Sequence, residues 1–176
     1  MHIKGGDQNM QKTNNYTIRL ATKEEVPQVI SLLKDVAASL NKNGIEQWGF
    51  LLQGGDDAEI EQAIKNQDTY VLLDEDRMIG TFTIYNQPEE WDLHIWRDKA
   101  HDSSYLHRLA VAPSYQGNDL GGIMLDWIDD NHMGFSNTLR LDCVANNDRL
   151  KDYYLQQGYQ LIGTYDDHYM LEKKMN

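Results

Sequence analysis

The chain has 176 residues, of which 40% are hydrophobic, and its formal net charge is −12 at pH 7. This length suits one domain with a substantial core and is too short to suggest two. The strong negative charge, without any basic run, argues against a nucleic-acid partner, because phosphate binding needs a concentrated positive surface. A small cationic substrate fits the charge better.

Membrane insertion, secretion and metal binding are also disfavoured by the sequence. No apolar run approaches the roughly 18 residues that cross a bilayer, and the first fifteen residues lack the apolar stretch of a signal peptide. The single cysteine, Cys143, leaves no intramolecular disulfide and no clustered thiolate metal site. We therefore expect a cytoplasmic protein without a metal, with a flexible tail over residues 1–15 and one domain over residues 16–176.

The predicted elements of the first half are strands and amphipathic helices. Thr22 and Glu25 form a capping box that starts a helix with an apolar face within residues 26–36. Asp56 and Glu59 start a second helix. In chain order, the prediction is a strand at 16–20, the first helix ended by NKNG at 41–44, a short helical or irregular piece at 45–52, the second helix, and two strands within 69–85.

A long linker is predicted next, over residues 86–104 (NQPEEWDLHIWRDKAHDSS), because this stretch is rich in charge. It carries two tryptophans, and loops of such length are often binding loops. The elements predicted after it are a strand at 104–113, a helix at 120–132, a strand at 138–145, a helix at 147–157, and strands at 158–165 and 168–174. The alternation of strand and helix predicts a parallel strand pair joined by a right-handed crossover.

The stretch PSYQGNDLGGIMLDW has three glycines around the start of an apolar helix, although glycine inside a helix costs about 1 kcal/mol relative to alanine. A turn into a helix N-terminus presents free backbone N–H groups and the positive end of the helix dipole. The stretch therefore predicts an anion site, where Gly117, Gly121 and Gly122 allow close approach and Gln116 and Asn118 add donors. Neither the dinucleotide fingerprint nor the P-loop fits these residues.

The same stretch is similar to the pyrophosphate loop of the GNAT family of acetyltransferases, whose signature is Q/R-x-x-G-x-G/A at a helix start. Gln116 stands at the Q/R position and Gly121 at the last glycine, while Asp119 replaces the usual middle glycine. A carboxylate beside a diphosphate is unfavourable unless it points away, although aspartate can serve as an N-cap. A second stretch, RLDCVANNDRLKDYYLQQGY, resembles the family's later motif, with Asn147 and Tyr154 at its asparagine and tyrosine positions.

The resemblance spans residues 17–173 and implies a fold and a cosubstrate. The implied fold is the α/β (α+β) GNAT fold, a mixed central sheet of about six to seven strands flanked by helices on both faces. The implied cosubstrate is acetyl coenzyme A, whose thioester is attacked directly by an amine. The cofactor-binding residues implied in this way are Leu109, Ala110, Val111, Gln116, Gly117, Asn118, Asp119, Leu120, Gly121, Gly122, Asn147 and Tyr154.

The resemblance also assigns Tyr154 the role of the family's tyrosine, which protonates the departing thiolate. Asn147 and Tyr154 are two helical turns apart and share a face, so Tyr153 is expected on another face. Cys143 is interpreted as a buried structural thiol rather than a nucleophile. Alternation along a strand sends it and Asp142 to opposite sides of the sheet.

His107 is our candidate for the general base that deprotonates the amine. Many family members carry a glutamate at this position, and the ordinary pKa of histidine suits neutral pH. A water relay remains open as the alternative, and His101 and Glu46 are further candidates. We expect the acceptor amine to bind in an aromatic-walled cleft with carboxylates nearby, and the predicted substrate-binding residues are Glu46, Trp48, Trp91 and Trp96.

The predicted function is transfer of an acetyl group from acetyl coenzyme A to a primary amine of a small molecule, polycations included, through a ternary complex. The identity of the acceptor stays open among polyamine-like amines, aminoglycosides, amino acids and protein N-termini. We expect no nucleic-acid or membrane partner, and a monomer or a homodimer. The alternative function is a coenzyme-A-binding regulatory or interaction module without turnover.

Overall fold

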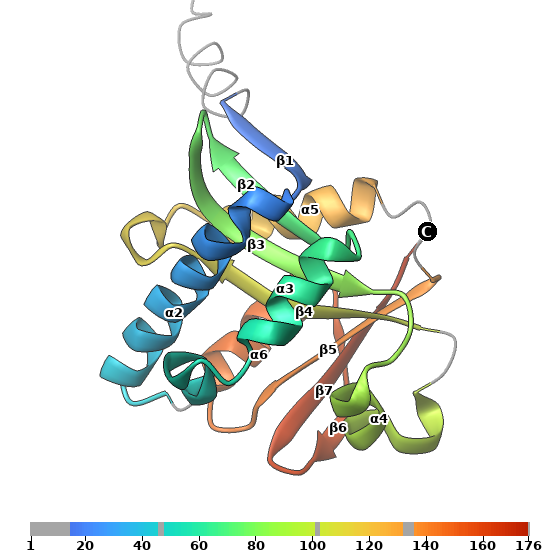
Figure 1. Cartoon of the computed structure of the whole chain (residues 1–176). Coiled ribbons are helices and arrows are strands. Elements are labelled where there is room, and N and C mark those ends of the chain that lie inside the picture. Colours follow the sequence, from blue (N-terminus) through green and yellow to red (C-terminus); the bar gives the residue numbers. More distant parts are fainter. Residues whose placement is uncertain (1–14, 46–47, 101–102, 132–135, 176) are drawn as a thin grey trace, which may run out of the picture.

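One seven-stranded sheet organises the described part of the chain. The residues that the computed structural model describes are 15–45, 48–100, 103–131 and 136–175. The predicted tail therefore lies outside them, apart from Asn15. The strands are β1 (Tyr16–Leu20), β2 (Thr69–Asp74), β3 (Arg77–Tyr85), β4 (Ser104–Val111), β5 (Thr138–Val144), β6 (Gln160–Tyr165) and β7 (His168–Lys174). They lie in the order β1-β2-β3-β4-β5-β7-β6 (Figure 1).

Five α-helices accompany the sheet within the described ranges. They are α2 (Val26–Lys42), α3 (Asp57–Lys65), α4 (Glu90–Trp96), α5 (Leu120–Asp130) and α6 (Asp148–Gln156). The buried faces of α2 and α3 pack on one side of the sheet, against side chains such as Val71 and Ala110. Leu120 and Met124 of α5 and Tyr154 of α6 pack on the other side. The predicted arrangement with helices on both faces is thus confirmed (Figure 1).

The strand directions make the sheet mixed. All neighbouring strands are antiparallel except β4 and β5, which are parallel and are connected through α5. A parallel pair in the second half of the chain was predicted from the alternation of strand and helix, and it is confirmed. None of the helices in the described ranges combines the length and the apolar character that a bilayer span requires.

The first helix begins as its capping box predicts. Glu25 accepts a hydrogen bond from the backbone N–H of Thr22 at 2.9 Å and pairs with Arg19 of β1 at 2.8 Å. The first turn, Lys23–Glu25, is a 3-10 helix that continues into α2 at Val26. The N-terminal strand is therefore tied to the helix that follows it.

The prediction of a linker over residues 86–104 is wrong, because α4 occupies its centre. Its start is a second capping box, in which the backbone N–H of Glu89 donates to Asp92 at 2.9 Å. Ile95 and Trp96 at the other end of the helix are buried. The helix is only two turns long, two of its exposed side chains are apolar and one of its buried ones is a carboxylate, so its sequence shows no clear period. The capping residues and the buried pair at the end were the available signals.

Candidate active site

The parallel strands β4 and β5 pair only at their beginnings. The register joins Ser104 to Leu139 and Tyr105 to Arg140, and no later residue of β4 pairs with β5 in the described structure. From Leu106 onward, β4 keeps β3 on one side and has no strand partner on the other. Backbone N–H and C=O groups on such an edge need partners, and an extended ligand can supply them as a neighbouring strand does. The predicted cofactor contacts on this strand are Leu109, Ala110 and Val111.

A bulge in β4 lies next to this edge. Arg108 has a φ of 54°, in the left-handed region that non-glycine residues rarely adopt. The register between β3 and β4 shifts between Thr81 and Thr83, which leaves an extra residue in β4. In a regular strand, consecutive side chains point to opposite faces of the sheet. Here His107 and Arg108 both contact Tyr85, on the face of the sheet that carries α3 and α4.

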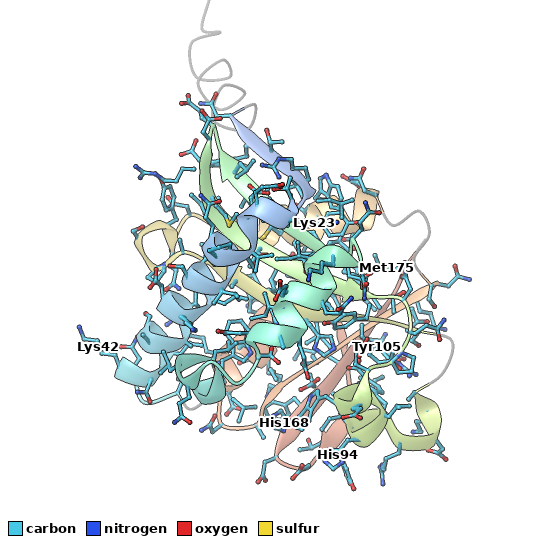
Figure 2. All side chains as sticks on the ribbon, viewed as in Figure 1. Lys23, Lys42, His94, Tyr105, His168 and Met175 are labelled. Atoms are coloured by element: carbon cyan, nitrogen blue, oxygen red, sulfur yellow. The ribbon has the colours of Figure 1, made fainter. Side chains whose placement is uncertain are left out.

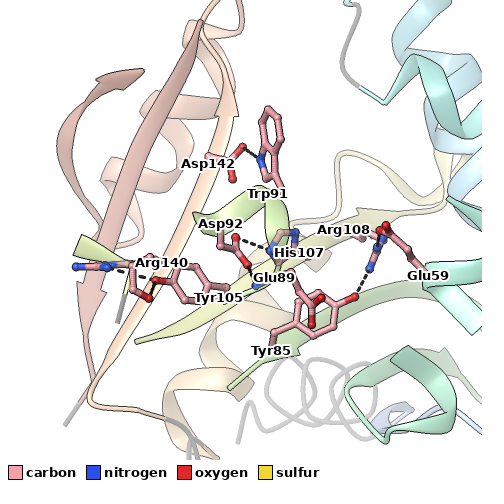
Figure 3. A network of polar contacts seen from close by, with 11 residues as sticks. Glu59, Tyr85, Glu89, Trp91, Asp92, Tyr105, His107, Arg108, Arg140 and Asp142 are labelled. Atoms are coloured by element: carbon pink, nitrogen blue, oxygen red, sulfur yellow. Dashed lines mark hydrogen bonds and ion pairs between the residues drawn. The ribbon is translucent and has the colours of Figure 1, made fainter. Parts of the chain in front are cut away.

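Arg108 is held by three side chains on this face (Figure 3). Its Nε donates to Asp56 at 2.8 Å, its Nη1 to the Tyr85 hydroxyl at 3.1 Å, and its Nη2 to Glu59 at 3.4 Å. Asp56 stands at the N-cap of α3, as predicted, but its side chain makes no capping hydrogen bond there. Its carboxylate pairs with the guanidinium instead.

Glu59 is a functional candidate that the sequence did not reveal. Its hydrogen bond with Asp56, together with partial burial and the charge of Asp56, raises the pKa of Glu59 to about 7. The side chain is 73% exposed and so is open to a ligand. A carboxyl group that titrates near neutrality can exchange protons with an amine.

His107 forms a buried pair with Asp92 of α4 (Figure 3). Its Nε2 lies 2.8 Å from Oδ1 of Asp92, and the side chain of Asp92 is only 1% exposed. Burial lowers the pKa of His107, but the hydrogen bond to Asp92 and the charges of Asp92 and Asp142 outweigh it. The pKa of His107 therefore lies above its ordinary value. Sequence reasoning found His107 and missed Asp92, which lies in the stretch interpreted as a linker.

Asp142 and Trp91 extend the polar cluster toward β5. The indole Nε1 of Trp91 donates to Asp142 at 3.0 Å (Figure 3). Burial raises the pKa of the Asp142 carboxyl. The Trp91 ring also contacts two histidine rings, His94 at 5.5 Å and His168 at 4.9 Å between centroids. Figure 2 shows these two histidines beside α4 and the β6–β7 hairpin.

The glycine turn before α5 contains two residues with a positive φ. Gly117 has a φ of 89°, and Asp119, at the N-cap of α5, has a φ of 54°. The predicted N-cap position of Asp119 is observed, but its side chain makes no capping hydrogen bond. The two predicted side-chain donors contact the backbone of their own loop. Gln116 donates to the carbonyl of Val111 at 3.4 Å, and Asn118 to that of Tyr115 at 3.0 Å.

The two glycines at the start of α5 make room for particular side chains. A Cβ atom at Gly121 would lie 2.9 Å from the hydroxyl of Tyr153, and one at Gly122 would lie 2.6 Å from a carboxylate oxygen of Asp119. The Tyr153 hydroxyl in turn donates to Asp119 at 3.4 Å. The bare backbone at this helix start is therefore needed for packing between α5 and α6, in addition to any role in ligand approach.

Helix α6 presents its two tyrosines differently. Asn147 is the N-cap and accepts a hydrogen bond from the backbone N–H of Leu150 at 3.1 Å. Tyr153 reaches toward the start of α5, whereas Tyr154 is 6% exposed and packs against the ring of Tyr159. The hydroxyl of Tyr154 has no hydrogen-bond partner among the described residues. Burial raises its pKa well above 10, so the hydroxyl keeps its proton at neutral pH.

The residues predicted for the acceptor wall have separate positions. Trp91 is 39% exposed, and Trp48 packs partly buried against the cluster of α2 and α3. Trp96 is 1% exposed and lies in the core, with the guanidinium of Arg140 4.3 Å above its ring, so the structure corrects its assignment to the wall. The helix mixes buried and exposed side chains, and the sequence pattern did not show on which side Trp96 lies. Glu46 and the alternative base His101 lie outside the described residues.

Cys143 is buried, on the side of the sheet opposite to Asp142. It belongs to the cluster of α5 and α6, while Asp142 bonds to Trp91 of α4. Burial raises the pKa of its thiol to about 12. A thiol that stays protonated at neutral pH is a poor nucleophile. The interpretation of Cys143 as a structural residue is consistent with this environment.

Replacing Gly121 by valine is expected to weaken coenzyme A binding by about tenfold or more. The new side chain would displace the Tyr153 hydroxyl and cover the start of α5. Titration calorimetry with coenzyme A measures the effect. Asp119→Gly is the matched comparison and should bind as well or better, since glycine suits the φ of 54° and carries no charge. Unchanged affinity in a folded Gly121→Val protein would show that the diphosphate binds elsewhere.

Comparison with known proteins agrees with this geometry. The model of the acetyltransferase (GNAT) family matches residues 38–159. The uncharacterized N-acetyltransferase YesJ of Bacillus subtilis is 33% identical over 156 residues, which are 88% of this chain and 87% of that protein.

Solved structures give the same result. A GNAT-family acetyltransferase from Listeria monocytogenes aligns with a TM-score of 0.80 at 29% identity, over 91% of this chain and 95% of that one. The PaiA N-acetyltransferase from Thermoplasma acidophilum, solved in complex with coenzyme A, aligns with a TM-score of 0.68 at 17% identity, over 90% and 98%. At that identity the second alignment speaks for the fold alone.

Proposed function

This chain belongs to the GNAT family of acetyltransferases, and we propose that it transfers an acetyl group from acetyl coenzyme A to a primary amine of a small, positively charged molecule. The acidic surroundings of His107, next to the point where β4 leaves β5, support this acceptor most directly. His107 contacts Asp92 and lies within the field of Asp142. The positive charge of Arg108 also acts on His107, but its guanidinium is paired with Asp56.

We assign acetyl coenzyme A to the free edge of β4 and to the turn before α5. The backbone from Leu106 to Val111, which has no strand partner on this side, suits an extended arm that carries amides. The start of α5 suits a diphosphate, because its first N–H groups have no partner within the helix. The choice of coenzyme A as the ligand is also supported by the PaiA enzyme, which shares the fold and was solved with coenzyme A. The cosubstrate supplies an acetyl group activated as a thioester.

The side chains of the site can handle the protons of this reaction. The ammonium gives a proton to His107, and the free amine then forms the C–N bond as the C–S bond breaks. Tyr154, protonated at neutral pH, gives its proton to the departing sulfur. The second proton of the nitrogen restores the tyrosine through solvent, so the products are an amide, a thiol and one proton. The backbone N–H groups beside the Arg108 bulge are available to the thioester oxygen.

The charge around the acceptor side favours a second cationic group on the substrate. Glu59 and Asp56 lie on the same face as His107 and Asp92, and the whole chain carries a net charge of −12. Such a field raises the local concentration of cations and speeds their association. An amine with an uncharged group at its other end gains less from this field, and one with a carboxylate there gains least.

Release of free thiol from acetyl coenzyme A, measured with three matched amines, tests the proposal. 1,4-Diaminobutane, 4-aminobutanol and 4-aminobutyrate share a primary amine and differ in the charge at the other end. The diamine should give the highest kcat/KM, and its advantage should shrink with salt, because exposed charges are screened over about 8 Å at physiological ionic strength. A preference for the alcohol or the acid would contradict a cationic acceptor. Coenzyme A binding without thiol release from any amine would indicate a binding module.

A further inference from the structure

We propose that Asp92 of α4 orients His107 for proton abstraction, so that the two side chains act as a histidine–aspartate pair across α4 and β4. The inference rests on the proposed function, in which His107 accepts the proton of the amine. Asp92 is then a positioning residue, supplied by a helix that packs against the sheet. Asp92 itself touches neither substrate in this account and acts through the imidazole.

Both oxygens of the Asp92 carboxylate are fixed. Oδ2 accepts a hydrogen bond from the backbone N–H of Glu89 at 2.9 Å, and Oδ1 lies 2.8 Å from Nε2 of His107. A carboxylate that is almost fully buried is costly unless its oxygens are paired. The capping box of α4 therefore holds the carboxylate at a set place, and the carboxylate holds the ring.

This contact determines which ring nitrogen can act as the base. A carboxylate only accepts hydrogen bonds, so Nε2 of His107 must carry a hydrogen, and in the neutral ring the lone pair is on Nδ1. Nδ1 has no hydrogen-bond partner among the described residues. The nitrogen that is free of the protein is thus the one that can take a proton from the substrate, while the carboxylate stabilises the imidazolium that forms.

The charged and titratable groups around the ring come from four elements. Asp92 belongs to α4, Asp142 to β5, Arg108 to β4 and Tyr85 to β3. Asp142 acts on His107 through its charge alone, whereas Asp92 also bonds to the ring. The bond sets both the direction of the ring and the proton affinity of Nδ1. Asp142, whose carboxylate is bonded by Trp91, cannot replace it.

The pKa of His107, measured by NMR in the unmodified protein and in the Asp92→Asn variant, tests the inference without relying on an activity assay. Removal of the carboxylate charge should lower the pKa of His107. The rise of kcat/KM with pH should move to lower pH with it, and its plateau should fall by up to roughly 10²- to 10⁴-fold, the range of general base catalysis. Glu89→Ala is the matched control, because it removes the other half of the capping box and leaves the His107 contact. It should leave the titration of His107 unchanged.

The unmodified protein gives a second readout that does not depend on the folding of a variant. The ring-nitrogen chemical shifts of neutral His107 should show the hydrogen on Nε2, and a hydrogen on Nδ1 would overturn the inference. An unchanged titration in Asp92→Asn would overturn it as well. If the titration moved and the pH profile of kcat/KM did not, orientation for proton abstraction would be refuted. Acetyl transfer itself is judged separately, by thiol release with the unmodified chain.

Discussion

Replacing Tyr154 by phenylalanine should lower kcat by about 10²- to 10⁴-fold, the range of general acid catalysis, or by less because a thiolate is already a fair leaving group. The fold and the affinity for coenzyme A should change little. The Tyr154 ring is packed in the core against Tyr159, and its hydroxyl bonds to no described residue. Loss of the oxygen therefore removes the proton donor and little else. Steady-state kinetics and coenzyme A titration of the same protein separate the two effects.

Tyr153→Phe is the control for this substitution. Tyr153 lies next to Tyr154 on α6, but its hydroxyl points to the start of α5 and to Asp119. It should change kcat much less. If Tyr153→Phe lost activity while Tyr154→Phe kept it, the catalytic tyrosine would be the other one. If neither changed kcat while chemistry limits the rate, solvent protonates the thiolate and both tyrosines serve packing.

The second large effect is expected for His107→Gln, which should lower kcat/KM by about 10²- to 10⁴-fold at neutral pH. The sign of the pH dependence follows from the raised pKa of His107. Below that pKa the imidazole is protonated and cannot accept a proton, so activity rises as pH increases through it and then levels off. Glutamine keeps a polar group of similar size and has no such titration. The rise of kcat/KM with pH should disappear in the variant.

Glu59 provides the sharpest competing explanation for a titration near neutrality. Its pKa is raised to about 7 by the hydrogen bond with Asp56, and its side chain is exposed. A pH profile of the unmodified enzyme cannot separate Glu59 from His107, but substitutions can. If His107→Gln kept both the rate and the profile while Glu59→Gln lost them, Glu59 would be the base. The inferred role of Asp92 would then fall with that of His107.

Much of the fold could be predicted because most elements have a clear period or cap. The seven strands, and the helices α2, α3, α5 and α6, follow from alternating or amphipathic patterns and from signals such as Thr22 with Glu25. Helix α4 was missed because it is only two turns long and mixes exposed apolar side chains with a buried carboxylate, which hides the period. Its contacts are long-range: Trp96 packs beside Arg140, far along the chain. Local sequence does not encode such contacts.

Only those candidate site residues that lie in continuous motifs could be proposed from the sequence. The glycine turn, Asn147 and Tyr154 lie in continuous motifs, so their spacing could be read. The cluster around Arg108 depends on a bulge that turns Arg108 to the same face as His107, and a regular strand predicts the opposite face. Asp56 resembled a helix cap from its position alone. Its partner is distant in sequence, and only the folded sheet brings the two together.

We propose that acetyl coenzyme A lies along the free edge of β4, between the start of α5 and Tyr154. A crystal structure of the complex with coenzyme A tests it most directly. We expect the diphosphate at the N-terminus of α5, the pantetheine amides bonded to backbone groups between Leu106 and Val111, and the sulfur within hydrogen-bond reach of the Tyr154 hydroxyl. A diphosphate bound away from α5, or a sulfur beside Tyr153 or distant from both tyrosines, would contradict it.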